Sequence, residues 1–304
     1  MEFSVPMRIR WDVDFRGAAG RAKRIARRIR EAAPLIVEIR IDGEKGLSLL
    51  PAVIAEIHKC NPRIEATVRL FPGVGAVARR GYPIDFVWRI PLGESFLGRL
   101  PEGASAISFV PDEETFPDLP EVLEEFSMSG LDTLHLPNVN AVRCLAEKGH
   151  VPVPAPSRIR EAAERISALG LSLRGKRLVV HDFFLWSALR KSFPDETGER
   201  MEFSGCQAGA ALAHVDWDGN VYPCDSLPVR LGNIEETPIA EIWRSPARLR
   251  MLEAIRSFPV SCGSCDSLKG CLSGCRGLAY VASGTLDSPD PACPSPRSGP
   301  PTRN

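Results

Sequence analysis

Seven of the nine cysteines in the sequence lie in the last third of the chain, where their spacing could bring several thiols to one place. The spacing is C-x17-C, a long gap, and then C-x2-C-x5-C-x3-C-x17-C. Short loops are needed to hold several thiolates on one metal centre, and a Cys-x2-Cys turn does this in zinc and iron–sulfur sites alike. The pattern therefore predicts a metal-binding module built from Cys206, Cys224, Cys262, Cys265, Cys271, Cys275 and Cys293.

Seven thiolates divide naturally into four and three, so one site can be ligated fully by thiolates and the other needs a further ligand. The simplest four-cysteine zinc layout pairs two C-x2-C turns, and the sequence has only one such turn. Cys60 and Cys144 stand 84 positions apart, and we expect them to be small buried apolar residues rather than ligands.

Composition narrows the class of protein further. Of 304 residues, 44% are hydrophobic and 25% are charged, as in soluble globular proteins. The 38 basic and 38 acidic side chains cancel, which argues against a binder of nucleic acid or anionic membranes. The sequence shows neither a secretory signal nor an apolar run of transmembrane length, so we expect a cytoplasmic protein. In that reducing compartment, clustered cysteines favour metal ligation over disulfides.

Upstream of the cysteines, short β-rich runs alternate with amphipathic helices, which is typical of βα units and a parallel sheet. We expect an α/β domain over residues 1–192, a cysteine-rich domain over 193–294 and a disordered tail over 295–304. Proline-rich residues 149–156 are expected to form a linker. The expected strands are 7–15, 35–41, 64–70, 84–90, 106–110, 131–136 and 177–180, and the expected helices are 18–33, 47–59, 119–129, 141–148, 157–169 and 183–191.

The cysteine-rich region contains its own turn and helix signals. Asp218-Gly219 predicts a hairpin between 213–217 and 220–223, and this hairpin would carry Cys206 and Cys224 towards each other. Helices are expected over 238–244 and 246–256, each with a proline near its first turn. The aromatic residues Trp217, Tyr222 and Trp243 are expected to pack a small core of this module.

The cysteines and the residues between them resemble a SPASM domain, the auxiliary iron–sulfur domain that follows the barrel of many radical SAM peptide maturases. The resemblance rests on G-C-Q-A-G (205–209), V-D-W-D-G-N-V-Y-P-C (215–224), L-G-N-I (231–234), E-I-W (241–243), C-G-S-C (262–265), C-L-S-G-C-R (271–276) and D-P-A-C-P (290–294). It implies a 4Fe–4S cluster II on Cys262, Cys265, Cys271 and Cys293, and a cluster I on Cys206, Cys224 and Cys275. Many members have a further ligand just before the residue matching Cys206, but residues 199–202 contain no thiol. Cluster I would then have an open iron, a carboxylate or external ligand, or fewer irons, or it would be absent.

The first half resembles a radical SAM barrel that has lost its own cluster motif. Where that family places C-x3-C-x2-C after the first strand, residues 16–20 read R-G-A-A-G. Residues 39–46 (I-R-I-D-G-E-K-G) resemble a degraded form of the family's G-G-E-P segment. The implied fold is a degenerate radical-SAM-like partial (β/α)6 barrel followed by a small SPASM domain, and S-adenosylmethionine is not expected as a cofactor.

A barrel without cluster cysteines joined to an intact SPASM module resembles the stand-alone SPASM proteins of GeoRSP systems. The resemblance implies a non-catalytic iron–sulfur protein that supports electron transfer or substrate handling in peptide modification. Its partners would be a radical SAM/SPASM enzyme, a PqqD-like peptide-binding protein and a ribosomal peptide. Two alternatives stay open: a structural scaffold stapled by zinc or an inert cluster, and an independent enzyme with a cofactor site in the barrel.

Three further features have two interpretations each. The helix over 21–30 carries six basic residues and forms either a solvated face or a dock for an acidic partner or leader peptide, the former being favoured. Asp42-Gly43-Glu44 is either a residual ligand pocket or a plain strand-to-helix turn, and we favour the turn. His181, Asp182 and His214 are either metal or proton-transfer groups or ordinary structural residues, and we favour the latter.

Overall fold

The strands form one continuous sheet in a computed structural model that describes residues 3–13, 19–70, 84–90, 95–193 and 206–295. The sheet has the order β10-β9-β8-β1-β2-β3-β4-β5-β6-β7. The pairs β10–β9 and β9–β8 are antiparallel, and the other neighbouring pairs are parallel. The strands are β1 (Arg8–Asp12), β2 (Ile36–Ile41), β3 (Arg63–Arg69), β4 (Asp85–Arg89), β5 (Ala106–Ser108), β6 (Thr133–Leu136), β7 (Arg177–Val180), β8 (Leu212–Val215), β9 (Asn220–Tyr222) and β10 (Gly232–Asn233).

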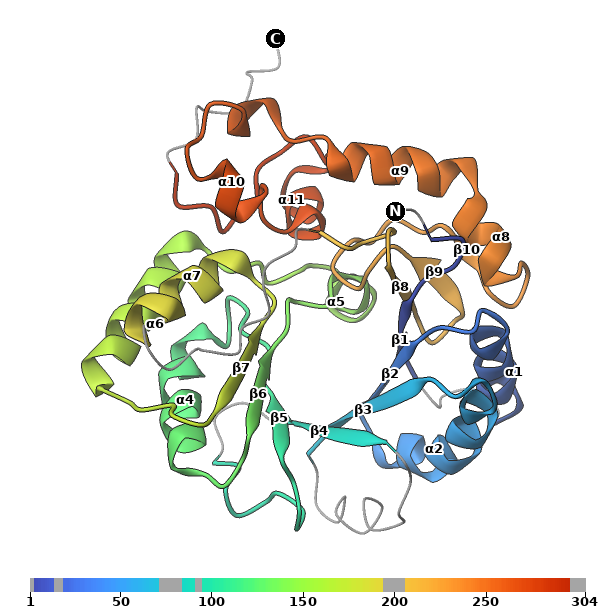
Figure 1. Ribbon diagram of the computed structural model, residues 1–304, viewed down its shortest axis with the longest axis horizontal. Helices are drawn as coiled ribbons and strands as arrows, with labels where there is room; N and C mark the ends of the chain where they lie inside the picture. Colours follow the sequence, from blue (N-terminus) through green and yellow to red (C-terminus); the bar gives the residue numbers. More distant parts are fainter. Residues whose placement is uncertain (1–2, 14–18, 71–83, 91–94, 194–205, 296–304) are drawn as a thin grey trace.

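Helices cover the outer face of this sheet, and the strands curve in an arc inside them (Figure 1). The helices of the first part are α1 (Ala19–Glu31), α2 (Glu44–Ile57), α4 (Leu119–Met128), α5 (Ala141–Lys148), α6 (Pro156–Leu169) and α7 (Phe183–Ser192). Those of the cysteine-rich region are α8 (Ile239–Arg244), α9 (Pro246–Arg256), α10 (Leu268–Cys271) and α11 (Arg276–Ser283). The α/β class with a partial barrel is therefore confirmed.

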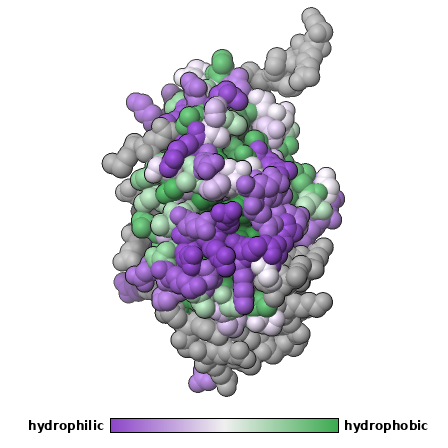
Figure 2. Space-filling model, turned by 90° about the vertical axis from the view of Figure 1, so that its right-hand side faces the viewer, coloured by the Kyte–Doolittle hydropathy of each residue, from purple (hydrophilic) through white to green (hydrophobic). Residues whose placement is uncertain are grey.

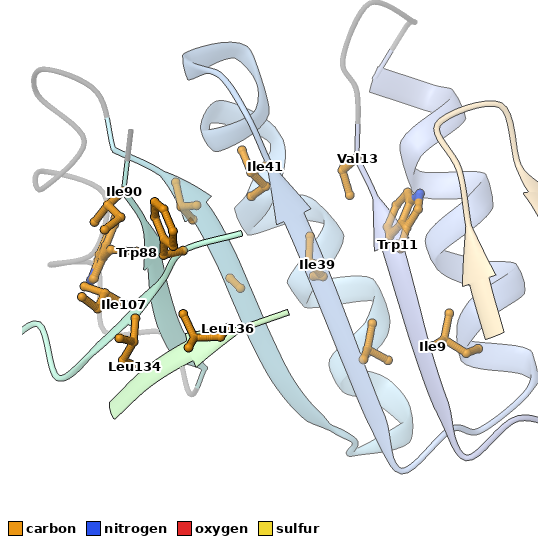
Figure 3. Close-up of a cluster of buried hydrophobic side chains, with 14 of the residues drawn as sticks. Ile9, Trp11, Val13, Ile39, Ile41, Trp88, Ile90, Ile107, Leu134 and Leu136 are labelled. Atoms are coloured by element: carbon orange, nitrogen blue, oxygen red, sulfur yellow. The ribbon is translucent and has the colours of Figure 1, made fainter. Parts of the chain in front are cut away.

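The strands β1 and β2 largely alternate buried apolar with polar side chains, because successive side chains of a strand point to opposite faces. In β1, Ile9 and Trp11 are buried on the helix side, and in β2 Ile39 and Ile41 are buried in the same way. Figure 3 shows these side chains between the strands and the flanking helices. The polar residues of the same strands consequently face the inside of the arc.

The sheet does not stop where the sequence predicts the domain boundary. Strand β8, from the cysteine-rich region, pairs in parallel with β1, and the backbone N–H groups of Met7 and Arg8 both donate to the carbonyl oxygen of Ala211. The parallel part of the sheet is therefore wider than the six strands of the expected barrel. The cysteine-rich region begins as an extension of the barrel's first edge.

The expected aromatic core of the module is wrong, because none of its three members belongs to the module's own cluster of buried side chains. Trp243 is buried, but it belongs to the same cluster of buried side chains as the barrel strands. Trp217 and Tyr222 are only partly buried, and the Tyr222 hydroxyl donates to Asp216 at 3.2 Å. A smaller cluster serves the module instead; it consists of Ala208, Leu212, Cys224, Leu227, Met251 and Ile255.

The basic helix α1 is held to the cysteine-rich region by ion pairs. Arg21 donates to Glu235 at 2.7 Å and to Asp218 at 3.0 Å, and Arg24 lies 3.2 Å from Glu235. Arg30 reaches Glu56 of α2 at 2.6 Å. Figure 2 shows the hydrophilic side chains gathered on the face that carries α1 and α2. Two arginines of this face therefore bind the hairpin region of the same chain, an arrangement that neither interpretation from the sequence included.

Residues 149–155 connect α5 to α6 within the barrel, and α6 begins at Pro156, the last residue of the expected linker. Several stretches with sequence-based predictions lie outside the described residues. They are the loop 14–18 after β1, the segment 194–205 before Cys206 and the tail from 296 onwards.

Candidate metal centres

Cys206, Cys224 and Cys275 come from three separate segments and form one group, here called group I. Cys224 follows β9, and Cys275 is the residue that precedes α11. Electrostatic repulsion from Cys206 and Cys224 raises the pKa of Cys275, and repulsion from Cys206 raises the pKa of Cys224. The structure therefore brings together the three cysteines that the resemblance assigns to cluster I, although their role as ligands remains a prediction.

Burial raises the pKa of all three thiols of group I, and neighbouring negative groups raise those of Cys224 and Cys275 further. Backbone N–H groups act in the opposite direction, because they donate to the sulfur atoms. Cys206 accepts from Ala208 and Arg276, Cys224 accepts from Ser226, and Cys275 accepts from Leu278. Buried sulfurs surrounded by N–H donors fit the ligands of an iron–sulfur cluster, whose potential such hydrogen bonds help to set.

A close backbone approach at Gly277 holds group I together. A Cβ atom added at position 277 would lie 2.5 Å from the carbonyl oxygen of Ser226 and 3.0 Å from the nitrogen of Leu227. Only glycine lets the first turn of α11 lie this close to the loop after Cys224. This packing places Cys275 beside Cys224.

Cys262, Cys265, Cys271 and Cys293 form the second group, here called group II, and they line one cavity of about 120 Å³. Electrostatic repulsion from Cys293 and Cys271 raises the pKa of Cys262. Repulsion from Cys293 and Cys265 raises the pKa of Cys271 in the same way. Burial is the main reason that the pKa values of Cys262 and Cys271 are raised. The four thiols around one enclosed space fit the cluster II assignment.

The two groups are adjacent in sequence at Cys271 and Cys275, and a left-handed turn separates them. Leu272, Ser273 and Gly274 have φ values of 48°, 64° and 69°. At Gly274 a Cβ atom would also lie 2.5 Å from Oδ2 of Asp290. This reversal of the chain after α10 directs Cys271 to group II and Cys275 to group I.

Among the described residues, no group of three or more His, Cys, Asp or Glu side chains is arranged to hold a single metal ion. Cys60 and Cys144 belong to neither group. Cys60 donates to the carbonyl oxygen of Ile57 at 3.3 Å, and Cys144 lies on α5.

The inside of the barrel is a second candidate site, which the sequence analysis left open as an alternative without naming the residues that line it. It is a cavity of about 590 Å³ whose walls carry many charged side chains. The signal was present in the sequence, because the polar residue at every second position of the strands predicts a polar interior. The lining includes Arg8, Arg10, Asp12, Glu38, Arg40, Glu65, Ser108, His135, Asn138, Arg143, Arg177 and His181.

An ion-pair network links this cavity to group I. Asp225, the residue after Cys224, accepts from Arg10 at 3.1 Å and from Arg40 at 2.6 Å, and Arg10 also donates to Glu38. Burial by itself would raise the pKa of Asp225, but the two guanidinium groups hold it below its usual range. His214 is fully buried with Nε2 3.5 Å from Asp12, and burial lowers its pKa. Asp225, directly after Cys224, is therefore joined to the arginines of the barrel interior, and His214 lies buried beside Asp12.

Asp42 and Gly43, in the segment that resembles a degraded G-G-E-P motif, both have structural roles. The Asp42 carboxylate pairs with Arg89 of β4 and with Arg143 of α5, and Gly43 is the N-cap of α2.

His181 lines the cavity, and burial lowers its pKa to about 4. Asp182 caps α7 by accepting from the backbone N–H of Leu185 at 2.7 Å.

Comparison with known proteins identifies the cysteine-rich region. The model of the SPASM family, an iron-sulfur cluster-binding domain, matches residues 206–266. An AdoMet-dependent heme synthase of Methanosarcina barkeri is 39% identical over 89 residues, which are 29% of this chain and 25% of that protein. The heme synthase of Nitratidesulfovibrio vulgaris is 34% identical over 100 residues, which are 33% of this chain and 27% of the relative. A PqqA peptide cyclase of Granulibacter bethesdensis is 23% identical over 201 residues, which are 62% of this chain and 48% of the cyclase.

This chain thus spans about a quarter to a half of the length of these relatives. Among solved structures, native anSMEcpe with bound AdoMet has a TM-score of 0.63 at 14% identity, over 94% of both chains. The same protein with AdoMet and the Cp18Cys peptide has a TM-score of 0.62 at 14% identity, over 95% of this chain and 94% of that one. At this identity, the likeness shows the fold alone.

The fold and the matches define the class of the protein. The chain contains a SPASM domain at the carboxyl end of a mixed α/β domain with the fold of radical SAM enzymes. Its relatives include AdoMet-dependent heme synthases and a PqqA peptide cyclase. A SPASM domain implies iron–sulfur cluster binding. In the described part of the chain, every helix falls short of the length and apolar character that a membrane crossing requires.

Proposed function

We propose that this chain is a non-catalytic iron–sulfur partner of a radical SAM/SPASM peptide maturase, of the kind found in GeoRSP systems. The observation that carries the proposal is the contrast between the two regions. The cysteine-rich region gathers seven thiols in two groups, whereas residues 13–20, where radical SAM enzymes have their cluster motif, contain no cysteine.

In this proposal, group II holds a 4Fe–4S cluster on four thiolates, and group I holds a second cluster on three. Such clusters supply one-electron transfer. The residues of the chain hold the thiolates, donate backbone N–H groups to the sulfurs and exclude water by burial. The fourth ligand of group I is either a carboxylate or an external group, and an external group could be part of the peptide substrate.

A reconstituted reaction tests this function. It contains the chain, a radical SAM/SPASM enzyme, a PqqD-like protein and a ribosomal peptide. We expect Cys265→Ala and Cys275→Ala to lower product formation by about tenfold or more, because each removes a cluster ligand. Cys60→Ala is the matched control, since Cys60 belongs to neither group. Undiminished product formation with both ligand variants would refute the proposal.

The barrel cavity supports a second candidate, an independent enzyme with its cofactor in the barrel. Its volume of about 590 Å³ and polar lining are compatible with a small ligand. Binding of S-adenosylmethionine to the isolated cluster-loaded protein by calorimetry, with formation of 5′-deoxyadenosine, would favour this candidate. We expect neither, because the chain lacks the three-thiolate loop that would hold the necessary cluster.

A further inference from the structure

Arg276 is a fully buried arginine with part of its hydrogen-bonding capacity unused. It is the first residue of α11 and is 1% exposed. Nη1 donates to the carbonyl oxygen of Ser288 at 2.9 Å and to the hydroxyl of Ser273 at 3.4 Å. Within the described residues, Nε and Nη2 have no acceptor. Burying N–H groups of a guanidinium without acceptors is costly, so their partners are to be sought in what the site binds.

The guanidinium lies near cysteines of both groups. The charges of Cys206 and Cys275 of group I and of Cys262 of group II all act on it, as does that of Asp290. Burial lowers the pKa of Arg276, and these four groups act in the opposite direction. The backbone N–H of Arg276 already donates to Cys206. One residue therefore contacts group I through its backbone and faces both groups with its side chain.

The other buried arginine of this region, Arg248, has a different environment. Its Nε donates to the carbonyl oxygen of Gly209 at 2.7 Å, and its guanidinium lies 4.8 Å from the centre of the Trp243 ring. Both of these partners lie outside the two cysteine groups. It therefore serves as a control for the loss of a buried arginine.

We propose that Arg276 donates its remaining N–H groups to sulfur atoms of both iron–sulfur sites and is a positioning residue that they share. This inference rests on the proposed function. Reduction adds negative charge to a cluster, so a nearby cation and N–H···S hydrogen bonds stabilise the reduced state and raise the reduction potential. Because one guanidinium interacts electrostatically with cysteines of both groups, its effect should reach both clusters.

Isotope labelling tests the contact in the unaltered protein. The full chain is produced with ¹⁵N in the arginine side chains, its clusters are reconstituted anaerobically, and the reduced sample is studied by pulsed EPR. We expect ¹⁵N hyperfine coupling at both clusters, retained in Arg248→Lys and lost in Arg276→Gln. Wild-type protein without coupling to arginine nitrogen at either cluster, or with coupling at only one, would overturn the proposal.

A redox titration monitored by EPR tests the consequence. In Arg276→Gln with iron and sulfide contents equal to wild type, both midpoint potentials should become more negative. Arg276→Lys should recover part of the shift because it keeps the charge, and Arg248→Lys should leave both potentials unchanged. Unchanged potentials in Arg276→Gln would refute the inference while leaving the proposed function intact. Wild-type protein that holds no labile sulfide would refute the proposed function itself.

Discussion

At the cysteines, burial and hydrogen bonding have opposite effects on the thiolate. Burial raises the pKa of Cys206, Cys224 and Cys275 and so disfavours their thiolate forms. The N–H donors around them become favourable when the sulfurs carry charge as ligands. Metal binding to such groups releases protons, and cluster assembly should therefore improve as the pH rises.

The substitution Gly277→Ala tests the close packing of α11 against the loop after Cys224. In Gly277→Ala the new methyl would overlap the carbonyl group of Ser226, so α11 must move away from the loop after Cys224. We expect a loss of about 1–3 kcal/mol in unfolding free energy and loss of cluster I iron with cluster II retained. Urea denaturation and EPR measure the two effects.

Gly130→Ala is the matched control for this substitution. A Cβ atom at Gly130 would have no neighbour within 4 Å, and Gly130 does not have a positive φ. The control should change stability by less than about 0.5 kcal/mol. Equal stability and iron content in Gly277→Ala and Gly130→Ala would show that the close approach at Gly277 has no role in forming group I.

At the scale of elements, β1 and β2 stabilise the inside of the barrel through charge pairs. Burial by itself would raise the pKa of Glu38, but Arg10, Arg8 and Arg40 outweigh it and lower the value to about 2. A lowered carboxyl pKa contributes stability above its unfolded value of 4.5, and this contribution is lost as the pH falls towards 2. The contribution at neutral pH is on the order of 3 kcal/mol.

The prediction is a fall in unfolding free energy between pH 4.5 and pH 2 that becomes shallower in Glu38→Gln. Urea denaturation at a series of pH values measures the slope. Glu114→Gln is the control, because Glu114 pairs with Lys148 on the exposed surface and should leave the slope unchanged. An identical slope in wild type and Glu38→Gln would mean that the Arg10–Glu38 pair does not stabilise the fold.

Helices and strands that a local sequence pattern indicates could be predicted. The distant segments with which they pair could not. The β-rich runs of β1 to β6 and the turn at Asp218-Gly219 are local patterns. The structure has a strand at each run, and β8 and β9 flank the turn. The pairing of β8 with β1 joins residues about two hundred positions apart, and no local pattern encodes that register. For the same reason the sequence did not reveal that Arg21 binds Glu235, or that Trp243 packs into the barrel core.

At the scale of the whole molecule, the cysteine-rich region and the barrel share one sheet and one main core. The ion pairs of Asp225 with Arg10 and Arg40 then connect the barrel interior to the residue after Cys224. The two candidate cysteine groups could be predicted, because the spacing of the cysteines and the residues between them form recognisable motifs. The cavity and the nearness of Arg276 to both groups depend on packing, which the spacing of the cysteines does not describe.

The measurement that tests the central claim most directly is the iron and acid-labile sulfide content of the reconstituted full chain, with EPR of the reduced sample. Two occupied cysteine groups predict about eight iron and eight sulfide per chain and two EPR signals. Cys265→Ala and Cys275→Ala should each remove a different one of these signals. Zinc without labile sulfide would contradict the account, and so would about four iron with a single signal, because only one group would then hold a cluster.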